Sequence, residues 1–224
     1  MNKNIKSIIL LSGGLDSLVS LGAEIEKHNV SLALTFDYGQ KSVTDEIEAS
    51  RKIADYYGIK HKIIKLDWLK EITKTALVGE AQIPTGKDLA NAHESMSNVW
   101  VPNRNGLFLN IAASFADADD YDYIVIGANR EEGETFTDNT ETFIERVNSE
   151  FEYSTVKKVK VLAPLIKFDK TEIVSFAIKN KVPLELTMSC YQGGGKHCGK
   201  CESCVRLKNA LKANSAEKYL KILF

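Results

Sequence analysis

The sequence predicts an α/β protein with a doubly wound parallel sheet of five strands. Short apolar runs alternate with segments of helical periodicity, which is typical of βαβ units. A Ser/Gly-rich loop follows the first apolar run, where such folds bind anions. The 224 residues suffice for one such domain and a small appendage, and all four cysteines lie within residues 190–204.

The spacing of the apolar residues places each element. Strands are expected where short apolar runs occur, and helices where apolar residues recur every three or four positions. Gly58 and Pro183 follow two of the helical segments as stop signals. We expect strands over residues 5–10, 31–36, 63–66, 123–126 and 159–164, and helices over 18–25, 43–57, 107–115, 143–147 and from 170 to about 180.

The segment 75–104 has weak periodicity and many polar residues. Connections of this length are usually functional or mobile. We expect this segment to cover the substrate.

The loop after the first strand, Ser12–Ser17, carries the strongest signal. Two glycines let the backbone approach a ligand closely, and the following helix N-terminus favours an anion such as phosphate. Asp16 adds a carboxylate that could hold Mg²⁺ against phosphate oxygens. Neither GxGxxG nor GxxxxGK[ST] is present. The alternative is an ordinary strand–turn–helix connection.

The positions of three further polar residues make them candidates for ligand binding. Arg104 stands at a helix start, where it could clamp a phosphate or carboxylate, or simply be a surface arginine. Lys170 also opens a helix, and it either reaches a triphosphate or lies on a solvated face. Asp138 either accepts hydrogen bonds from a guanine-like base or, like Thr137, caps the next helix.

The cysteines Cys190, Cys198, Cys201 and Cys204 have the spacing of a closed tetrahedral site. We favour one structural Zn²⁺ over an iron–sulfur cluster or thiol redox chemistry. His197 is expected to lie near the metal or on the surface without binding it. We therefore expect an α/β domain over residues 1–185 and a zinc-binding helical subregion over 186–224.

Charge and hydropathy bear on partners and location. The sequence shows no signal peptide and no membrane-spanning run, so we expect a cytoplasmic protein that contacts no membrane. Residues 1–150 carry a net charge of −9 and residues 151–224 a net charge of +8. The basic part either binds nucleic acid or serves the phosphates of a small ligand or an acidic partner. We favour the second reading and expect no nucleic-acid partner.

The motif SGGLDS at residues 12–17 resembles the pyrophosphate-binding loop of the N-type ATP pyrophosphatases, which have an adenine nucleotide alpha hydrolase-like fold. With TFDYGQ at 35–40, VPNRNGLFL at 101–109 and the cysteine spacing, the chain resembles the 7-cyano-7-deazaguanine synthase family from residue 8 to about residue 211. That family commonly has Gly where Asn103 stands, and residues 131–139 differ from its usual bacterial pattern.

The resemblance implies a ligase that makes 7-cyano-7-deazaguanine from 7-carboxy-7-deazaguanine and ammonia. ATP with Mg²⁺ would adenylate the carboxylate and then the amide, and we expect a homodimer. Catalytic roles are implied for Asp16, Arg104 and Lys170. The implied ATP-binding residues are Leu11, Ser12, Gly13, Gly14, Leu15, Asp16, Ser17, Leu18, Thr35, Phe36 and Gly127, and the implied substrate-binding residues are Tyr38, Gln40, Arg104 and Asp138.

Two other functions compete with this one. Another N-type ATP pyrophosphatase could adenylate a tRNA base, which the basic C-terminal part favours. A non-catalytic nucleotide-binding module is a third possibility, but binding alone would not require Asp16 and both serines.

Overall fold

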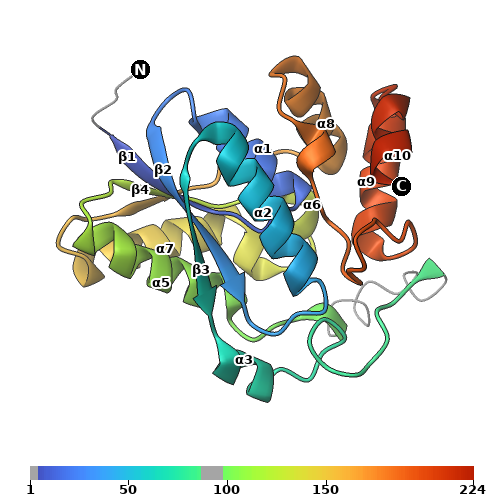
Figure 1. Cartoon of the computed structure of the whole chain (residues 1–224). Coiled ribbons are helices and arrows are strands. Elements are labelled where there is room, and N and C mark those ends of the chain that lie inside the picture. Colours follow the sequence, from blue (N-terminus) through green and yellow to red (C-terminus); the bar gives the residue numbers. More distant parts are fainter. Residues whose placement is uncertain (1–4, 87–97) are drawn as a thin grey trace.

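The computed structural model describes residues 5–86 and 98–224. A parallel sheet in the order β3-β2-β1-β4-β5 forms its centre (Figure 1). The strands are β1 (Lys6–Leu10), β2 (Asn29–Asp37), β3 (Lys60–Lys65), β4 (Tyr123–Val125) and β5 (Lys160–Leu162). The predicted fold class is therefore confirmed, with strand ends that differ from the expected ones by a few residues.

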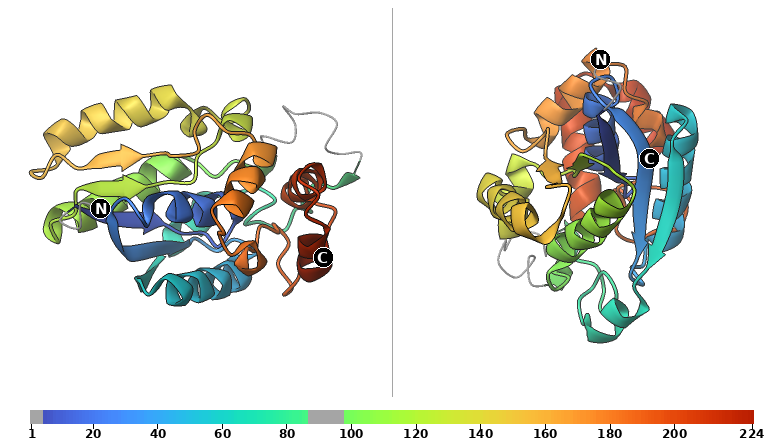
Figure 2. Two further views of the ribbon diagram at one scale, coloured as in Figure 1. Left: turned by 90° about the horizontal axis from the view of Figure 1, so that it is seen from above. Right: turned by 90° about the vertical axis from the view of Figure 1, so that its left-hand side faces the viewer.

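Helices cover both faces of the sheet (Figure 2). The helices α5 (Arg104–Ala118) and α7 (Glu141–Ser154) share a core with one face. The other face shares a core with α1 (Leu15–Glu24), α2 (Val43–Tyr57), α8 (Lys170–Lys179), α9 (Glu202–Ala213) and α10 (Glu217–Leu223). Successive side chains of a strand point to opposite faces, so Ile8 joins the first core and Ile9 the second.

Short elements complete the described chain: α3 (Asp67–Ile72), α6 (Arg130–Gly133) and two 3₁₀ helices, Thr137–Asn139 and Leu184–Leu186. The sequence did not predict α3 or α10. The predicted third strand is present, but it begins at Lys60 and not at residue 63, and β3 is an edge strand with three exposed lysines. Lysines on an edge strand discourage pairing with another chain.

The structure shows which residue caps α7, whereas the sequence suggested Thr137 or Asp138 for this role. The hydroxyl of Thr140 accepts a hydrogen bond from Phe143 N, so Thr140 is the N-cap. Neither Thr137 nor Asp138 caps this helix, because both lie in the preceding 3₁₀ turn. The Asp138 carboxylate is therefore not committed to capping.

The start of α5 shows how the chain accommodates Asn103. This residue has a φ of 50°, in the left-handed region. Glycine adopts this conformation most readily, and asparagine is among the residues that tolerate it. Asn103 can therefore stand where the similar family commonly has Gly, and Arg104 begins the helix directly after it.

The strand order reverses between β1 and β4, which pair directly. In doubly wound sheets, ligands bind beyond the carboxyl ends of the strands at this switch point. The loops that follow β1 and β4 therefore lie side by side at the edge where a ligand is expected.

Four further expectations concern the covering segment, the membrane, the domain division and the oligomeric state. The expected covering segment 75–104 includes residues 87–97, which lie outside the described residues. Within the described part of the chain, no helix has both the length and the apolar character needed to cross a membrane. The division at residue 185 and the homodimer remain predictions.

Candidate active site

The Ser12–Ser17 loop is held in place by its own hydroxyl groups. Ser17 Oγ accepts from Ser12 N at 3.2 Å and donates to Gly14 O at 3.0 Å. Gly13 has a φ of 76°, and a Cβ there would lie 2.8 Å from Ala49 Cβ of α2. The loop is thus preorganised against α2, and Gly13 admits no side chain.

The predicted ATP-binding residues fall into two groups. One group lines a cavity at the switch point: Leu11, Ser12, Gly14, Asp16, Ser17, Phe36 and Gly127. The others support the site from behind it: Gly13 contacts α2, Leu15 and Leu18 are buried in the core, and Thr35 Oγ1 donates to Leu11 O at 2.6 Å. Any role of this second group in binding ATP remains a prediction.

Gly127 lies where β4 ends, against the first turn of α1. A Cβ at this position would meet Ser17 N at 2.8 Å and the Asp16 carbonyl carbon at 2.9 Å. We expect Gly127→Ala to cost about 1–3 kcal/mol in the free energy of unfolding and to weaken ATP binding, since the loop must shift. Thermal melting and calorimetric titration measure both effects.

Gly14→Ala is the matched control. Gly14 has a φ of −77°, and the nearest atom to an added Cβ is 3.4 Å away, which is ordinary contact. We expect its melting temperature to stay within about 2 °C of the wild type. Equal melting temperatures for the two variants would contradict the close approach at Gly127.

Lys170 joins the Ser12–Ser17 loop to the loop after β4. Its Nζ lies 2.5 Å from Asp16 Oδ2 and 2.7 Å from Glu132 Oε1, with the lysine side chain only 10% exposed. Its backbone N donates to Glu131 Oε2 at 3.1 Å. The capping box of Asp169 and Glu172 fixes the start of α8 and hence the position of Lys170.

The ionisation of this cluster favours a cationic partner. Burial raises the pKa of Asp16 to about 6, although Lys170 opposes the shift. Burial also acts to raise the pKa of Glu132, but the charge and hydrogen bond of Lys170 outweigh it and lower that pKa. Burial lowers the pKa of Lys170, whereas both carboxylates raise it well above its usual range. At neutral pH the three groups therefore carry one net negative charge.

The far end of the cavity is aromatic and carries a second set of charges. Phe36 and Phe108 stack with centroids 3.9 Å apart, and Trp100 and Phe136 also line the cavity with nearly parallel rings. Arg104 also lines this end, with one guanidinium nitrogen 3.4 Å from Tyr38 Oη. This end offers flat apolar faces beside a charged donor, which suits a planar heterocycle.

The predicted substrate residues Tyr38, Arg104 and Asp138 all line this end of the cavity. Burial acts to lower the pKa of Arg104, but Tyr38 and Asp138 outweigh burial and raise this pKa above its usual value. The guanidinium therefore stays charged. Burial raises the pKa of the Asp138 carboxyl, and Arg104 opposes that shift. The structure thus brings three of the four predicted substrate residues together.

Gln40 is placed differently. Its amide accepts from Tyr38 N and donates to Phe36 O and to Glu46 Oε2, and the side chain is buried outside the cavity wall. These contacts hold the loop that carries Tyr38. A direct contact between Gln40 and substrate remains a prediction.

Several cavity residues were not predicted from the sequence: Glu46, Trp100, Glu132, Ser189 and Tyr191. Glu132 follows β4 at the same sheet edge as the Ser12–Ser17 loop, and this position after a strand could have marked it as a site residue. Ser189 and Tyr191 flank Cys190, so the cysteine region forms one wall of the cavity.

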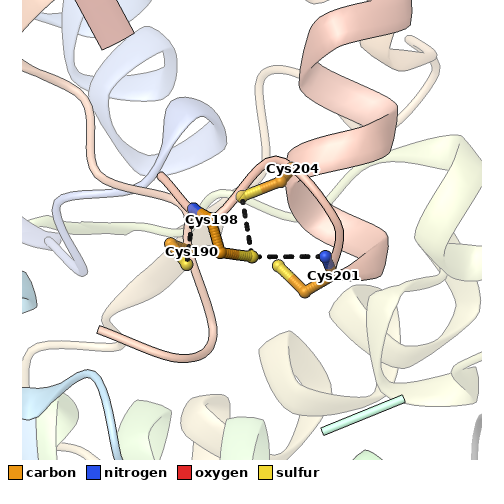
Figure 3. A group of neighbouring side chains, drawn as sticks. All are labelled: Cys190, Cys198, Cys201 and Cys204. Atoms are coloured by element: carbon orange, nitrogen blue, oxygen red, sulfur yellow. Dashed lines mark hydrogen bonds between the residues drawn. The ribbon is translucent and has the colours of Figure 1, made fainter. Parts of the chain in front are cut away.

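The four cysteines converge as predicted (Figure 3). Their sulfur atoms all lie within 4.8 Å of one another, and Cys198 and Cys204 are 3.9 Å apart. Tetrahedral zinc thiolates require sulfur–sulfur separations of about 3.8 Å. Backbone N–H groups of Cys201 and Lys200 point at Cys198 Sγ, and hydrogen bonds from Cys201 and Cys204 lower the pKa of Cys190. The cluster could therefore hold a metal ion.

His197 does not join the cysteines. Its Nε2 accepts from Ser189 N at 3.0 Å, so Nδ1 carries the proton and donates to Leu223 O at 3.1 Å. Its ring is buried and lies against Phe224. His197 therefore anchors the loop between Cys190 and Cys198, and it lies beside the cysteine cluster without joining it.

The sheet order, with a Ser/Gly loop and a lysine at its switch point, defines a doubly wound α/β protein with a candidate ligand site beyond the carboxyl ends of β1 and β4. The family model described as "Queuosine biosynthesis protein QueC" matches residues 6–215. The chain belongs to this family, which confirms the resemblance stated from the sequence motifs.

Curated relatives agree with this assignment. The chain is 51% identical over 213 residues to the 7-cyano-7-deazaguanine synthase of Carboxydothermus hydrogenoformans, covering 93% of this chain and 99% of the relative. The protein of the same name from Methanosarcina barkeri is 48% identical over 217 residues, with 93% and 94% covered. Among solved structures, an NMN synthetase from Francisella tularensis shares 13% identity with a TM-score of 0.49, over 97% of this chain and 87% of that one.

Proposed function

We propose that this protein converts 7-carboxy-7-deazaguanine and ammonia to 7-cyano-7-deazaguanine at the expense of ATP. The observation that carries the proposal is one shared cavity, in which the Ser12–Ser17 loop and the Lys170 partners Asp16 and Glu132 meet a charged aromatic end. The name shared by the curated relatives supports it. One end suits a polyphosphate and the other a planar base with a carboxylate.

The reaction must turn an oxygen into a leaving group twice. The substrate carboxylate attacks the α-phosphorus of ATP, and pyrophosphate leaves. Ammonia then attacks the acyl carbon of the adenylate, and AMP leaves with formation of the amide. The amide oxygen attacks a second ATP in the same way, after which loss of AMP and of the amide protons gives the nitrile. Charge develops on the departing pyrophosphate in both activation steps.

The described residues suit these steps. The Ser12–Ser17 loop and Lys170 would bind the phosphates and neutralise the departing pyrophosphate. Arg104 would hold the substrate carboxylate, and Asp138 would accept hydrogen bonds from the guanine-like edge of the base. Phe36 and Phe108 would supply apolar contact for an aromatic ring.

Mg²⁺ would bind at Asp16. The buried Asp16 Oδ1 has no hydrogen-bond partner among the described residues, whereas Oδ2 holds Lys170. A carboxylate oxygen without a partner suits a hard cation, and Mg²⁺ in such sites is usually shared between one or two carboxylates and substrate phosphates. The ion supplies charge neutralisation at the phosphates.

The affinity for MgATP should fall as the pH drops through about 6. Asp16 has a pKa of about 6 because burial disfavours its ionised form. Below this pH a proton must leave before a cation binds, so affinity should fall about tenfold for each further pH unit. Calorimetric titration between pH 5 and pH 8 measures this dependence.

Asp16→Asn is the control, because it removes the titrating group while keeping the shape of the side chain. We expect weak binding of MgATP that changes little between pH 5 and pH 7. The same slope in this variant would exclude Asp16 as its source.

The cysteine site would hold one structural Zn²⁺. Four thiolates close a tetrahedral shell and leave no position for a substrate. Cys190, Cys201 and Cys204 are buried, so the ion would hold α9 and the loop before it against the domain.

Product analysis tests the proposed reaction. Mass spectrometry after incubation with ATP, Mg²⁺, ammonium and 7-carboxy-7-deazaguanine should show the nitrile and two AMP for each nitrile formed. The rival is an adenylase of a tRNA base, which the positive charge of residues 151–224 favours. AMP formed only when tRNA is added would overturn the proposal in favour of this rival.

A further inference from the structure

We propose that Ser189, beside the four-cysteine site, binds a phosphate group of the nucleotide and links that site to the phosphate loop. The inference rests on the proposed function, since it requires a polyphosphate ligand in the cavity. It adds a phosphate-binding residue that lies outside the Ser12–Ser17 loop.

Three hydrogen bonds connect the segment Thr187–Ser189 to the phosphate loop. Met188 N donates to Gly13 O at 2.8 Å, and Thr187 Oγ1 donates to the same oxygen at 3.3 Å. Leu15 N donates to Ser189 Oγ at 3.0 Å. Leu15 is the first residue of α1, so its N–H is one of the groups that a helix N-terminus leaves without an internal partner.

The hydroxyl proton of Ser189 remains available to donate one hydrogen bond. Its oxygen accepts the Leu15 N–H, and no acceptor for its own proton is present among the described residues. Ser189 lines the cavity beside Ser12, Gly14 and Ser17, and a Cβ at Gly14 would lie 3.6 Å from its Oγ. A phosphate held by the loop would therefore place oxygen acceptors within reach of this proton.

Hydrogen bonds beside the cysteine cluster fix the position of Ser189. Its N–H donates to His197 Nε2, and His197 in turn donates to Leu223 O. The next residue is Cys190 and the residue after His197 is Cys198, so two of the four converging cysteines lie beside this pair. The cysteine site and the α1 N-terminus are thus joined by one short series of hydrogen bonds.

The test compares two variants of the same segment. Ser189→Ala removes both the acceptor for Leu15 and the proposed phosphate donor, whereas Thr187→Val removes one contact to Gly13 O and leaves Ser189 intact. Losing a hydrogen bond to a charged group should raise the pyrophosphate dissociation constant about tenfold or more in Ser189→Ala. We expect less than about threefold in Thr187→Val, and recovery in Ser189→Thr, which retains a hydroxyl.

Calorimetric titration with pyrophosphate measures these constants, while zinc content and melting temperature report on the fold. Equal dissociation constants for Ser189→Ala and the wild type would overturn the proposal. Equal weakening in Ser189→Ala and Thr187→Val would also overturn it, because Ser189 would then act only by holding the loop. A wild type that binds neither ATP nor pyrophosphate would overturn the proposed function together with this inference.

A measurement on the wild type covers the case in which Ser189→Ala does not fold. In the ¹⁵N-labelled protein, pyrophosphate should shift the amide resonances of Leu15 and Ser189. Resonances that stay in place at saturating pyrophosphate would contradict the proposed contact.

Discussion

Lys170→Met is expected to destabilise the protein and to abolish AMP formation. The substitution leaves Asp16 and Glu132 as neighbouring, partly buried carboxylates without their shared buried cation. Removing one partner of a buried ion pair costs about 3–5 kcal/mol, which lowers the melting temperature of a chain of this size by roughly 6–20 °C. Thermal melting and a chromatographic assay for AMP measure the two effects.

Asp16→Ala should lose AMP formation as Lys170→Met does, but it should keep its melting temperature. Lys170 keeps Glu132 as a partner in this variant, so the fold should survive while AMP formation is lost. The triple variant Lys170→Met/Asp16→Asn/Glu132→Gln removes every charge of the cluster and should recover most of the lost stability without activity. Normal turnover by Asp16→Ala would remove Asp16 from the mechanism, and an unchanged melting temperature in Lys170→Met would contradict the buried cluster.

Cys201→Ser is expected to lose metal and stability together. Cys201 is fully buried among the other sulfur ligands and stands at the N-cap of α9. Metal loss is among the few changes that cost on the order of 4 kcal/mol or more, because metal binding is coupled to folding. We expect a fall in melting temperature of roughly 10 °C, with metal content measured by emission spectroscopy.

Lys200→Ala is the matched control for Cys201→Ser. This neighbouring side chain is exposed and carries no sulfur, while its backbone contact to Cys198 Sγ is kept. Its metal content and melting temperature should equal those of the wild type. A chelator should reproduce the effect of Cys201→Ser on the wild type, and a metal-free wild type that melts normally would contradict a structural site.

The place of the Ser12–Ser17 loop at the cavity and the convergence of the cysteines could be predicted because each motif is local in the sequence. The loop occupies six consecutive residues after one strand, and the cysteines span fifteen positions. In both cases the residue types and their spacing indicate which ligand to expect. The parallel sheet could be predicted for a similar reason, since buried strands appear as nearly continuous apolar runs.

The partners of these motifs could not be predicted in the same way. Ser189 contacts a residue 174 positions away, and Glu132 approaches Lys170 across 38 positions. Such pairs depend on how two loops meet at the switch point. Thr35 and Gln40 show the opposite difficulty, because the same polar side chains that bind ligands also stabilise loops, and here they bond to Leu11, Phe36 and Tyr38.

The left-handed backbone at Asn103 has a practical consequence for finding similar proteins. A search pattern that demands glycine before the arginine would discard this chain, although Asn103 adopts the left-handed backbone that glycine takes most readily. A pattern written for the dihedral angle, admitting glycine, asparagine and aspartate, would retain it and would still reject branched side chains.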